Sequence, residues 1–78
     1  MLLYMYGGLR MEEQEIGRLK KTDSTSVVVR INEFQGEKGV DIREYVETNK
    51  YTGLTKKGTR IPASKWPEFK ALIDKVEI

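Results

Sequence analysis

Alternating apolar and polar positions predict four β-strands in this chain. Residues 26–31 give the strongest signal, because the run Ser-Val-Val-Val-Arg-Ile is rich in β-branched side chains. Three further segments have an alternating or short basic pattern that is typical of strands, namely residues 16–21, 40–46 and 56–61. Turn-forming residues separate the four segments, at positions 22–25, 34–39 and 48–55.

The alternation assigns side chains to opposite faces of the predicted strands. In residues 40–46, one face carries Val40, Ile42, Glu44 and Val46, and the other carries Asp41, Arg43 and Tyr45. In residues 16–21, one side carries Ile16, Arg18 and Lys20, and the other carries Leu19. Asp41 and Glu44 are therefore expected on opposite faces, which argues against a shared metal site for a nuclease.

The period changes after Pro62, where apolar residues recur every three or four positions. This spacing predicts a C-terminal helix, whose apolar stripe serves the core or a dimer interface and consists of Trp66, Phe69, Leu72, Ile73 and Val76. Ser64 is the expected N-cap, and Pro67 then falls in the first turn, where amide hydrogens lack intrahelical partners anyway.

Four strands followed by one helix predict an α+β fold with an antiparallel sheet. The 78-residue chain has no cysteine and no histidine, so neither a disulfide nor an ordinary zinc site stabilises it. One helix is too small to cover both faces of such a sheet. The other face is expected to be solvated, to hold a ligand or to meet another subunit, and the small core favours a homodimer.

Residues 1–12 are expected to be an N-terminal extension, and residues 13–78 the domain. Positions 1–10 are apolar but too short to cross a bilayer, and they lack the features of a signal peptide. Met11 stands directly before an acidic run, so we interpret positions 1–10 as disordered and dispensable, or as the product of an upstream start. An extra strand or an interface arm is the alternative. No membrane partner is expected.

The net charge of +2 is small but unevenly distributed. Residues 48–70 carry six cations and one acid, a local balance of +5, whereas residues 31–47 have a balance of −3. Such a basic segment indicates either a polyanion site or a solvated surface. The missing histidine and cysteine exclude the usual nucleophile–base pairs, which favours a binding protein over an enzyme. Residues 36–39 lack the glycine spacing of a nucleotide-binding loop, and neither a cofactor nor a metal ion is expected.

Several short motifs, taken in order, resemble one known family. They are Val27-Val-Val-Arg30, Phe34 before a glycine loop, Asp41-Ile-Arg-Glu-Tyr45, Lys56-Lys-Gly58 and a helix that holds Trp66. Together they resemble the C-terminal domain of the positive-cofactor-four (p15) family of transcriptional coactivators. The resemblance implies a curved antiparallel sheet, a homodimer and binding of single-stranded DNA. It also implies a role in transcription, with contacts to the transcription machinery, or in replication or repair. The expected location is the cytoplasm and nucleoid of a prokaryote, or the nucleus of a eukaryote.

The resemblance also assigns roles to individual residues. Phe34 matches an aromatic residue that stacks on bases, and Arg43 matches a basic position that faces the DNA strand. Lys56 and Lys57 match a basic turn, and Trp66 matches a tryptophan that packs. Val46 departs from the family, which has a second DNA-stacking tryptophan at this position. Either the affinity for DNA is lower, or another ring replaces the tryptophan, and Tyr51 is the candidate.

Single-strand binding requires cations along the phosphates and flat rings for the bases. The residues expected to supply these contacts are Arg18, Lys20, Arg30, Phe34, Arg43, Tyr45, Lys50, Tyr51, Lys56 and Lys57. Structural roles are the alternatives, in which Phe34 closes the core, Tyr45 packs, and Arg43 pairs with Glu33 or Glu44. A protein-interaction module and an RNA-binding module remain open as functions, whereas a nucleic-acid enzyme is disfavoured.

Overall fold

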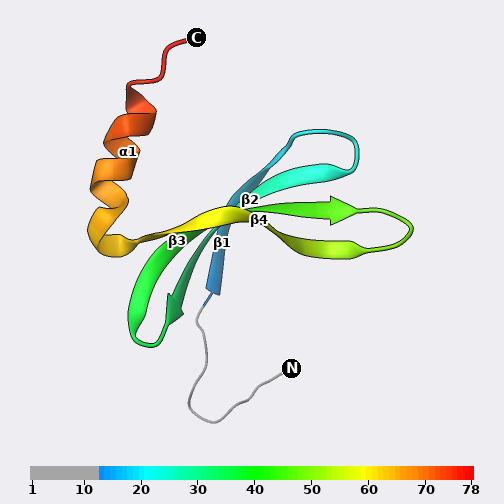
Figure 1. Cartoon of the computed structure of the whole chain (residues 1–78), viewed down its shortest axis with the longest axis horizontal. Coiled ribbons are helices and arrows are strands. Elements are labelled where there is room, and N and C mark those ends of the chain that lie inside the picture. Colours follow the sequence, from blue (N-terminus) through cyan, green and yellow to red (C-terminus); the bar gives the residue numbers. More distant parts are fainter. Residues whose placement is uncertain (1–12) are drawn as a thin grey trace.

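The computed structural model describes residues 13–78, which form a four-stranded antiparallel sheet followed by a helix (Figure 1). The elements are β1 (Glu13–Lys20), β2 (Thr25–Phe34), β3 (Glu37–Glu47), β4 (Thr52–Pro62), a 3₁₀ turn η1 (Ala63–Lys65) and α1 (Trp66–Asp74). Strands that follow one another in the chain are neighbours in the sheet, in the order β1-β2-β3-β4. The predicted fold class is confirmed, and the extension expected at residues 1–12 lies outside the described residues.

All four strands are longer than the alternation predicted. Residues 52–55, expected in a loop, form the first part of β4. The turn between β2 and β3 is reduced to Gln35 and Gly36, which have φ angles of 53° and 80°. Positive φ at both central positions is what a tight hairpin needs to match the twist of its strands, and glycine adopts it without strain.

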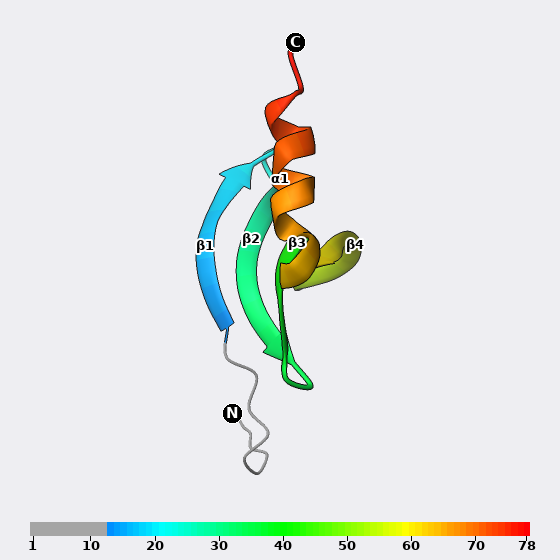
Figure 2. The ribbon, with the colours of Figure 1, turned by 90° about the vertical axis from the view of Figure 1, so that its left-hand side faces the viewer.

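The register between β2 and β3 is unbroken, from Thr25 opposite Val46 to Phe34 opposite Glu37. It confirms the two faces predicted for residues 40–46. Irregularities occur on both sides of this pair, in β1 between Glu15 and Gly17 and in the β3–β4 pair at Glu44. Ile16 falls in the first of them and has no partner in β2, so the regular alternation predicted from Ile16 is wrong. Bulges of this kind bend strands, and the sheet is strongly curved (Figure 2).

The register divides the sheet into two chemically different faces. One, the arginine face, carries one arginine from each strand, namely Arg18, Arg30, Arg43 and Arg60. The other, the apolar face, carries Leu19, Val27, Val29, Ile31, Val40, Ile42, Val46 and Ile61. The arginine face holds the one fully buried apolar side chain among residues 13–78, Val28, which is 1% exposed. Arg18 and Arg43 are its cross-strand neighbours, so their aliphatic stems flank it.

No layer of the described chain covers the apolar face. Seven of its eight residues are half-buried, and Leu19 is 69% exposed. Helix α1 leaves one end of the sheet and packs chiefly on η1 and on β4 (Figure 1). The chain therefore has an apolar surface on its sheet that the helix does not bury.

Helix α1 differs from its prediction at both ends. Ser64 lies in η1 and is not the N-cap; Lys65 takes that position without a side-chain hydrogen bond. Pro67 lies in the first turn, as predicted. The helix ends at Asp74, so Val76 lies beyond it and the predicted helical stripe is one residue too long.

The apolar stripe of α1 is buried only at its start. The rings of Trp66 and Phe69 are half-buried, with centroids 5.7 Å apart. Leu72, Ile73 and Val76 are exposed, so these three do not belong to a core formed by residues 13–78. Their role in a dimer interface stays a prediction.

Candidate nucleic-acid interface

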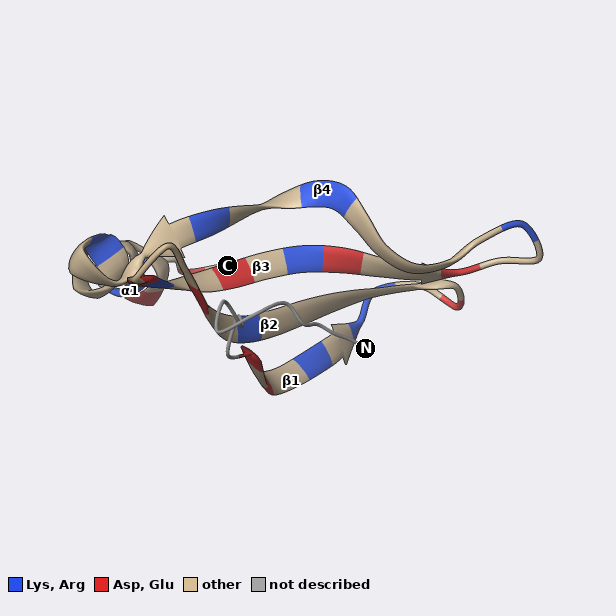
Figure 3. Ribbon diagram, turned by 90° about the horizontal axis from the view of Figure 1, so that it is seen from below, with Lys and Arg blue, Asp and Glu red and all other residues tan. Residues whose placement is uncertain are grey.

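The arginine face places a cation on every strand of the sheet. Arg18 and Arg43 flank Val28 in one row, and Arg30 and Arg60 flank Asp41 in the next. Figure 3 shows basic bands on all four strands. Because these side chains start from paired strands, the sheet fixes their positions relative to one another.

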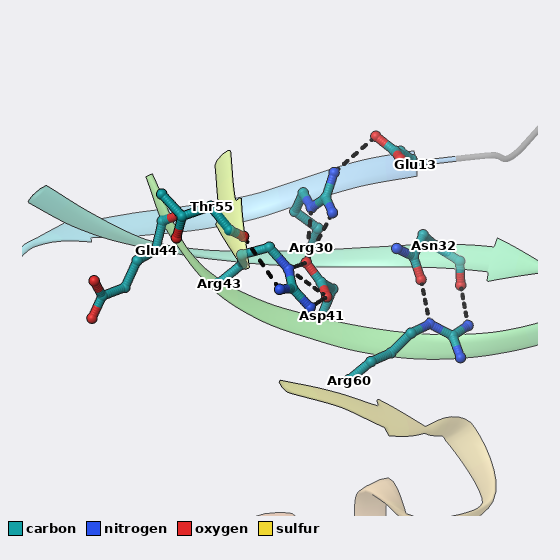
Figure 4. A network of polar contacts seen from close by, with 8 residues as sticks. All are labelled: Glu13, Arg30, Asn32, Asp41, Arg43, Glu44, Thr55 and Arg60. Atoms are coloured by element: carbon teal, nitrogen blue, oxygen red, sulfur yellow. Dashed lines mark hydrogen bonds and ion pairs between the residues drawn. The ribbon is translucent and has the colours of Figure 1, made fainter. Parts of the chain in front are cut away.

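Asp41 holds two of these arginines together at the centre of the face (Figure 4). Its side chain is 3% exposed and accepts from Arg30 Nη2 at 2.8 Å and from Arg43 Nη2 at 2.9 Å. Further bonds run from both Nε atoms, and Arg43 also donates through Nη1 to the carbonyl of Thr55 at 3.3 Å. Burial alone would raise the pKa of Asp41, but the bonds and charges of Arg43 and Arg30 outweigh it and hold the pKa below its ordinary value.

Two exposed acids of β1 pair with the outer part of the face. Glu15 accepts from Arg18 at 2.8 and 2.9 Å, and Glu13 accepts from Arg30 Nη1 at 3.1 Å. The hydrogen bond from Arg18 lowers the pKa of Glu15. Arg18 also lies over the ring of Tyr45, 4.8 Å from its centroid, so the guanidinium reaches across β2.

The ion pairs named as the alternative role of Arg43 do not form. Arg43 pairs with Asp41, not with Glu33 or Glu44. Glu44 lies on the opposite face, where it accepts from Lys21 Nζ at 2.9 Å. That hydrogen bond lowers the pKa of Glu44, and the nearby charge of Lys57 contributes.

Exposed aromatic rings mark the two ends of β3. Phe34 is 53% exposed and lies opposite Glu37, where β3 begins. Tyr51 is 52% exposed and follows the end of β3. Ten residue steps along β3 correspond to about 33 Å of strand, and the two rings lie near its opposite ends. Tyr45 is half-buried beneath Arg18, which leaves it less accessible than the other two.

Tyr51 is held in place at the base of its loop. Its hydroxyl donates to the carbonyl of Leu54. A Cβ atom on Gly53 would lie 3.0 Å from that hydroxyl oxygen and 3.3 Å from Cζ, so the ring lies over the Gly53 backbone. Gly53 is the register partner of Val46. Tyr51 therefore lies beside Val46, where the resemblance implies a tryptophan, and its role as a replacement ring stays a prediction.

The ten predicted contact residues fall into two groups. The six on the arginine face and its edge are Arg18, Lys20, Arg30, Phe34, Arg43 and Tyr45. The four on the β3–β4 hairpin, all exposed, are Lys50, Tyr51, Lys56 and Lys57. The basic segment 48–70 is thus spread over a hairpin, the arginine face and a helix.

The prediction left out three residues of this face. Arg60 and Asn32 are not among the predicted contacts, and Asp41 belongs to the family motif but has no predicted role in binding. Alternation within one strand does not fix its register with the next, and it is the β3–β4 register that places Arg60 opposite Asp41 and Gly58 opposite Arg43. Asp41 and Glu44 do lie on opposite faces, and the described residues contain no group of three or more acidic side chains that could hold a metal ion.

A four-stranded antiparallel sheet with one cationic face and an exposed ring at its edge is an arrangement suited to binding nucleic acid along a β-surface, because cations meet phosphates and rings stack on bases. The chain belongs to the Transcriptional Coactivator p15 (PC4) family, whose model matches residues 21–72. No match was found among curated proteins or among solved structures. The family consists of non-enzymatic domains that bind single-stranded DNA, dimerise and interact with the transcription machinery. Within residues 13–78, α1 lacks the length and apolar character to span a membrane.

Proposed function

We propose that this chain is a sequence-tolerant single-stranded DNA-binding module that acts as a homodimer in transcription, replication or repair. The observation that supports it most is the arginine face, to which each of the four strands contributes one arginine. The exposed rings of Phe34 and Tyr51, near the two ends of β3, support it further. DNA is the partner, so the nucleoid or the nucleus is the proposed location. The chain acts by binding and not by catalysis.

Affinity arises from phosphates and bases separately. Lys and Arg side chains neutralise phosphates and release counterions, which gives a salt-dependent term. Each stacked base adds about 1–3 kcal/mol, and stacking accepts any base because every base has a π-face. Glu13 and Glu15 are exposed, so a phosphate can displace them from Arg30 and Arg18. None of these contacts reads base edges, which accounts for tolerance of sequence.

The direct test is fluorescence polarisation of a labelled oligo-dT of about 20 nucleotides, at low and moderate salt. Tight binding that matched duplex DNA fails to displace supports the proposal. Displacement by duplex at equal concentration contradicts single-strand preference, and tighter binding of oligo-U points to RNA. Absence of binding at low salt contradicts the proposal and directs the search to protein partners of the apolar face.

Two substitutions separate stacking from phosphate contacts. Phe34→Ala is expected to weaken oligo-dT binding about tenfold at every salt concentration, because one stacked base is lost. Lys57→Ala is expected to reduce the slope of log affinity against log salt by about 0.7 per phosphate contact. Phe34→Tyr keeps a ring and serves as the control for the first. Unchanged affinity in Phe34→Ala and an unchanged slope in Lys57→Ala would contradict these assignments.

A homodimer is expected from the uncovered apolar surface. The apolar face of the sheet and the exposed Leu72 and Ile73 of α1 are surfaces that a second copy would bury. Light scattering at micromolar concentration is therefore expected to give twice the chain mass of 9.0 kDa. Leu72→Glu is expected to lower that mass, whereas Lys70→Glu, on the same helix, is not. The mass of one chain for the unaltered protein would contradict the dimer.

A further inference from the structure

Arg60 differs from the other arginines of the arginine face in its partners. Carboxylates hold Arg18, Arg30 and Arg43. Arg60 instead donates to neutral oxygens of Asn32, from Nε to Oδ1 at 2.9 Å and from Nη2 to the carbonyl at 3.4 Å (Figure 4). Its Nη2 also donates to the carbonyl of Glu37 at 2.8 Å. Its position is fixed, while no carboxylate within residues 13–78 neutralises its charge.

The backbone beneath Arg60 fits its guanidinium. Gly39 lies between Asn32 of β2 and Pro62 of β4 in the register. A Cβ atom on Gly39 would lie 2.6 Å from Arg60 Cζ, so the guanidinium rests directly on this buried glycine. Asn32 is itself only 6% exposed. An arginine held in this way loses little side-chain entropy when it binds an anion.

The Arg60 guanidinium lies beside the strand position that pairs with Phe34. Glu37, whose carbonyl accepts from Arg60 Nη2, is the register partner of Phe34. No group within residues 13–78 accepts from Nη1 of Arg60, so its two N–H groups remain for a ligand. A fixed cation thus lies near an exposed ring, and these are the two components that a nucleotide of a single strand requires.

We propose that Arg60 and Phe34 form a subsite for one nucleotide, in which Arg60 Nη1 donates to a backbone phosphate while Phe34 stacks on the adjoining base. This inference rests on the proposed function and adds Arg60 as a phosphate-binding residue of that site. A phosphate has to compete with the buried Asp41 for Arg30 and Arg43, whereas at Arg60 it meets no competing carboxylate in the described chain.

Removal of the charge gives the first test. With the oligo-dT probe, Arg60→Gln is expected to lower affinity about tenfold at low salt and to reduce the salt slope by about 0.7. Lys70→Gln makes the same charge change on α1 and is expected to keep affinity and slope. If the unaltered protein binds and Arg60→Gln binds equally well, the subsite is overturned and the proposed function stands. If the unaltered protein fails to bind oligo-dT, both are overturned.

The second test displaces the Arg60 guanidinium without removing its charge. Gly39→Ala has no unfavourable φ to overcome, but its new methyl group has to push the Arg60 guanidinium aside. It is expected to lower affinity about as much as Arg60→Gln although the net charge is unchanged. Gly17→Ala is the control, because within the described chain no atom lies within 4 Å of the place its methyl group would take. Thermal unfolding confirms that each variant is folded, and unaltered affinity in a folded Gly39→Ala would contradict the fixed position.

An abasic oligonucleotide separates the two roles within the subsite. On a sugar–phosphate strand without bases, Phe34→Ala is expected to have no effect, and Arg60→Gln is expected to keep its full effect. On oligo-dT, the double variant is expected to lose less than the product of the two single losses, because both residues hold one nucleotide. An Arg60→Gln effect that disappears on the abasic strand would overturn the phosphate role.

Discussion

Asp41→Asn is expected to lower the free energy of unfolding by about 3 kcal/mol. The carboxylate is 3% exposed and accepts from Arg30 and Arg43, whose side chains are only 15% and 23% exposed. Asparagine keeps the shape but not the charge, so two poorly solvated guanidinium groups would repel each other without a shared counterion. Urea unfolding at fixed protein concentration measures the change.

Glu44→Gln is the matched control for this substitution. It removes the same charge from the same strand, but on the opposite face, where Glu44 pairs with the exposed Lys21. A much smaller change is expected, since exposed ion pairs contribute little. Equal losses in the two variants would mean that the Asp41 network has no special role in stability.

The dependence on pH follows from the direction of the Asp41 shift. Its pKa lies below the ordinary value of 3.8, so the folded chain releases this proton more readily than the unfolded chain does. The stability contributed by Asp41 is therefore complete above about pH 4 and is lost as the pH falls toward and through the lowered pKa. The difference in unfolding midpoint between the unaltered protein and Asp41→Asn is expected to narrow in that range. A difference that stays constant down to acid pH would contradict this account.

Gly58→Ala is the second substitution with a large expected effect, a loss of about 3 kcal/mol in the free energy of unfolding. Gly58 has a φ angle of 149° and lies opposite Arg43. A Cβ atom there would lie 2.2 Å from the carbonyl oxygen of Ile42 and 2.8 Å from Cα of Arg43. Both are backbone atoms of β3, so the methyl group fits only if the β3–β4 pairing opens.

Urea unfolding again measures this loss, and Gly17→Ala is the control. No atom of the described residues lies within 4 Å of a Cβ on Gly17, and its φ is ordinary. Gly17→Ala is therefore expected to change stability little. A Gly58→Ala variant as stable as Gly17→Ala would show that β3 and β4 adjust more easily than their register implies.

The faces of the central strands were predictable because their alternation is local. Residues 40–46 lie as the period of two requires, with Asp41, Arg43 and Tyr45 on one side. Local patterns were less informative where the strands are irregular. The bulge at Ile16 disrupts the alternation of β1, and the β3–β4 register that places Arg60 opposite Asp41 does not follow from the pattern of β4 alone.

The errors at the helix have a similar physical origin. Ser64 is a good N-cap by residue type, but β4 continues to Pro62 and the chain then makes a 3₁₀ turn, which moves the start of the helix to Trp66. The spacing of the apolar stripe does not show whether its residues pack against the sheet of the same chain or against another surface. In the described chain only Trp66 and Phe69 find partial cover, while Leu72 and Ile73 stay exposed.

By itself, the sequence determined the number and order of the four strands and the helix, the antiparallel class and the family. It also determined which residue types suit a single-stranded nucleic acid. These features follow from short patterns of residues that are close together in the chain. The tertiary structure alone decided which cations share a face and which carboxylate holds each of them. Asp41 unites Arg30 and Arg43, and Arg60 lies across Gly39 among neutral oxygens, because strands distant in sequence are paired in one register. That pairing depends on the bulges and on long-range hydrogen bonds, which no local pattern encodes.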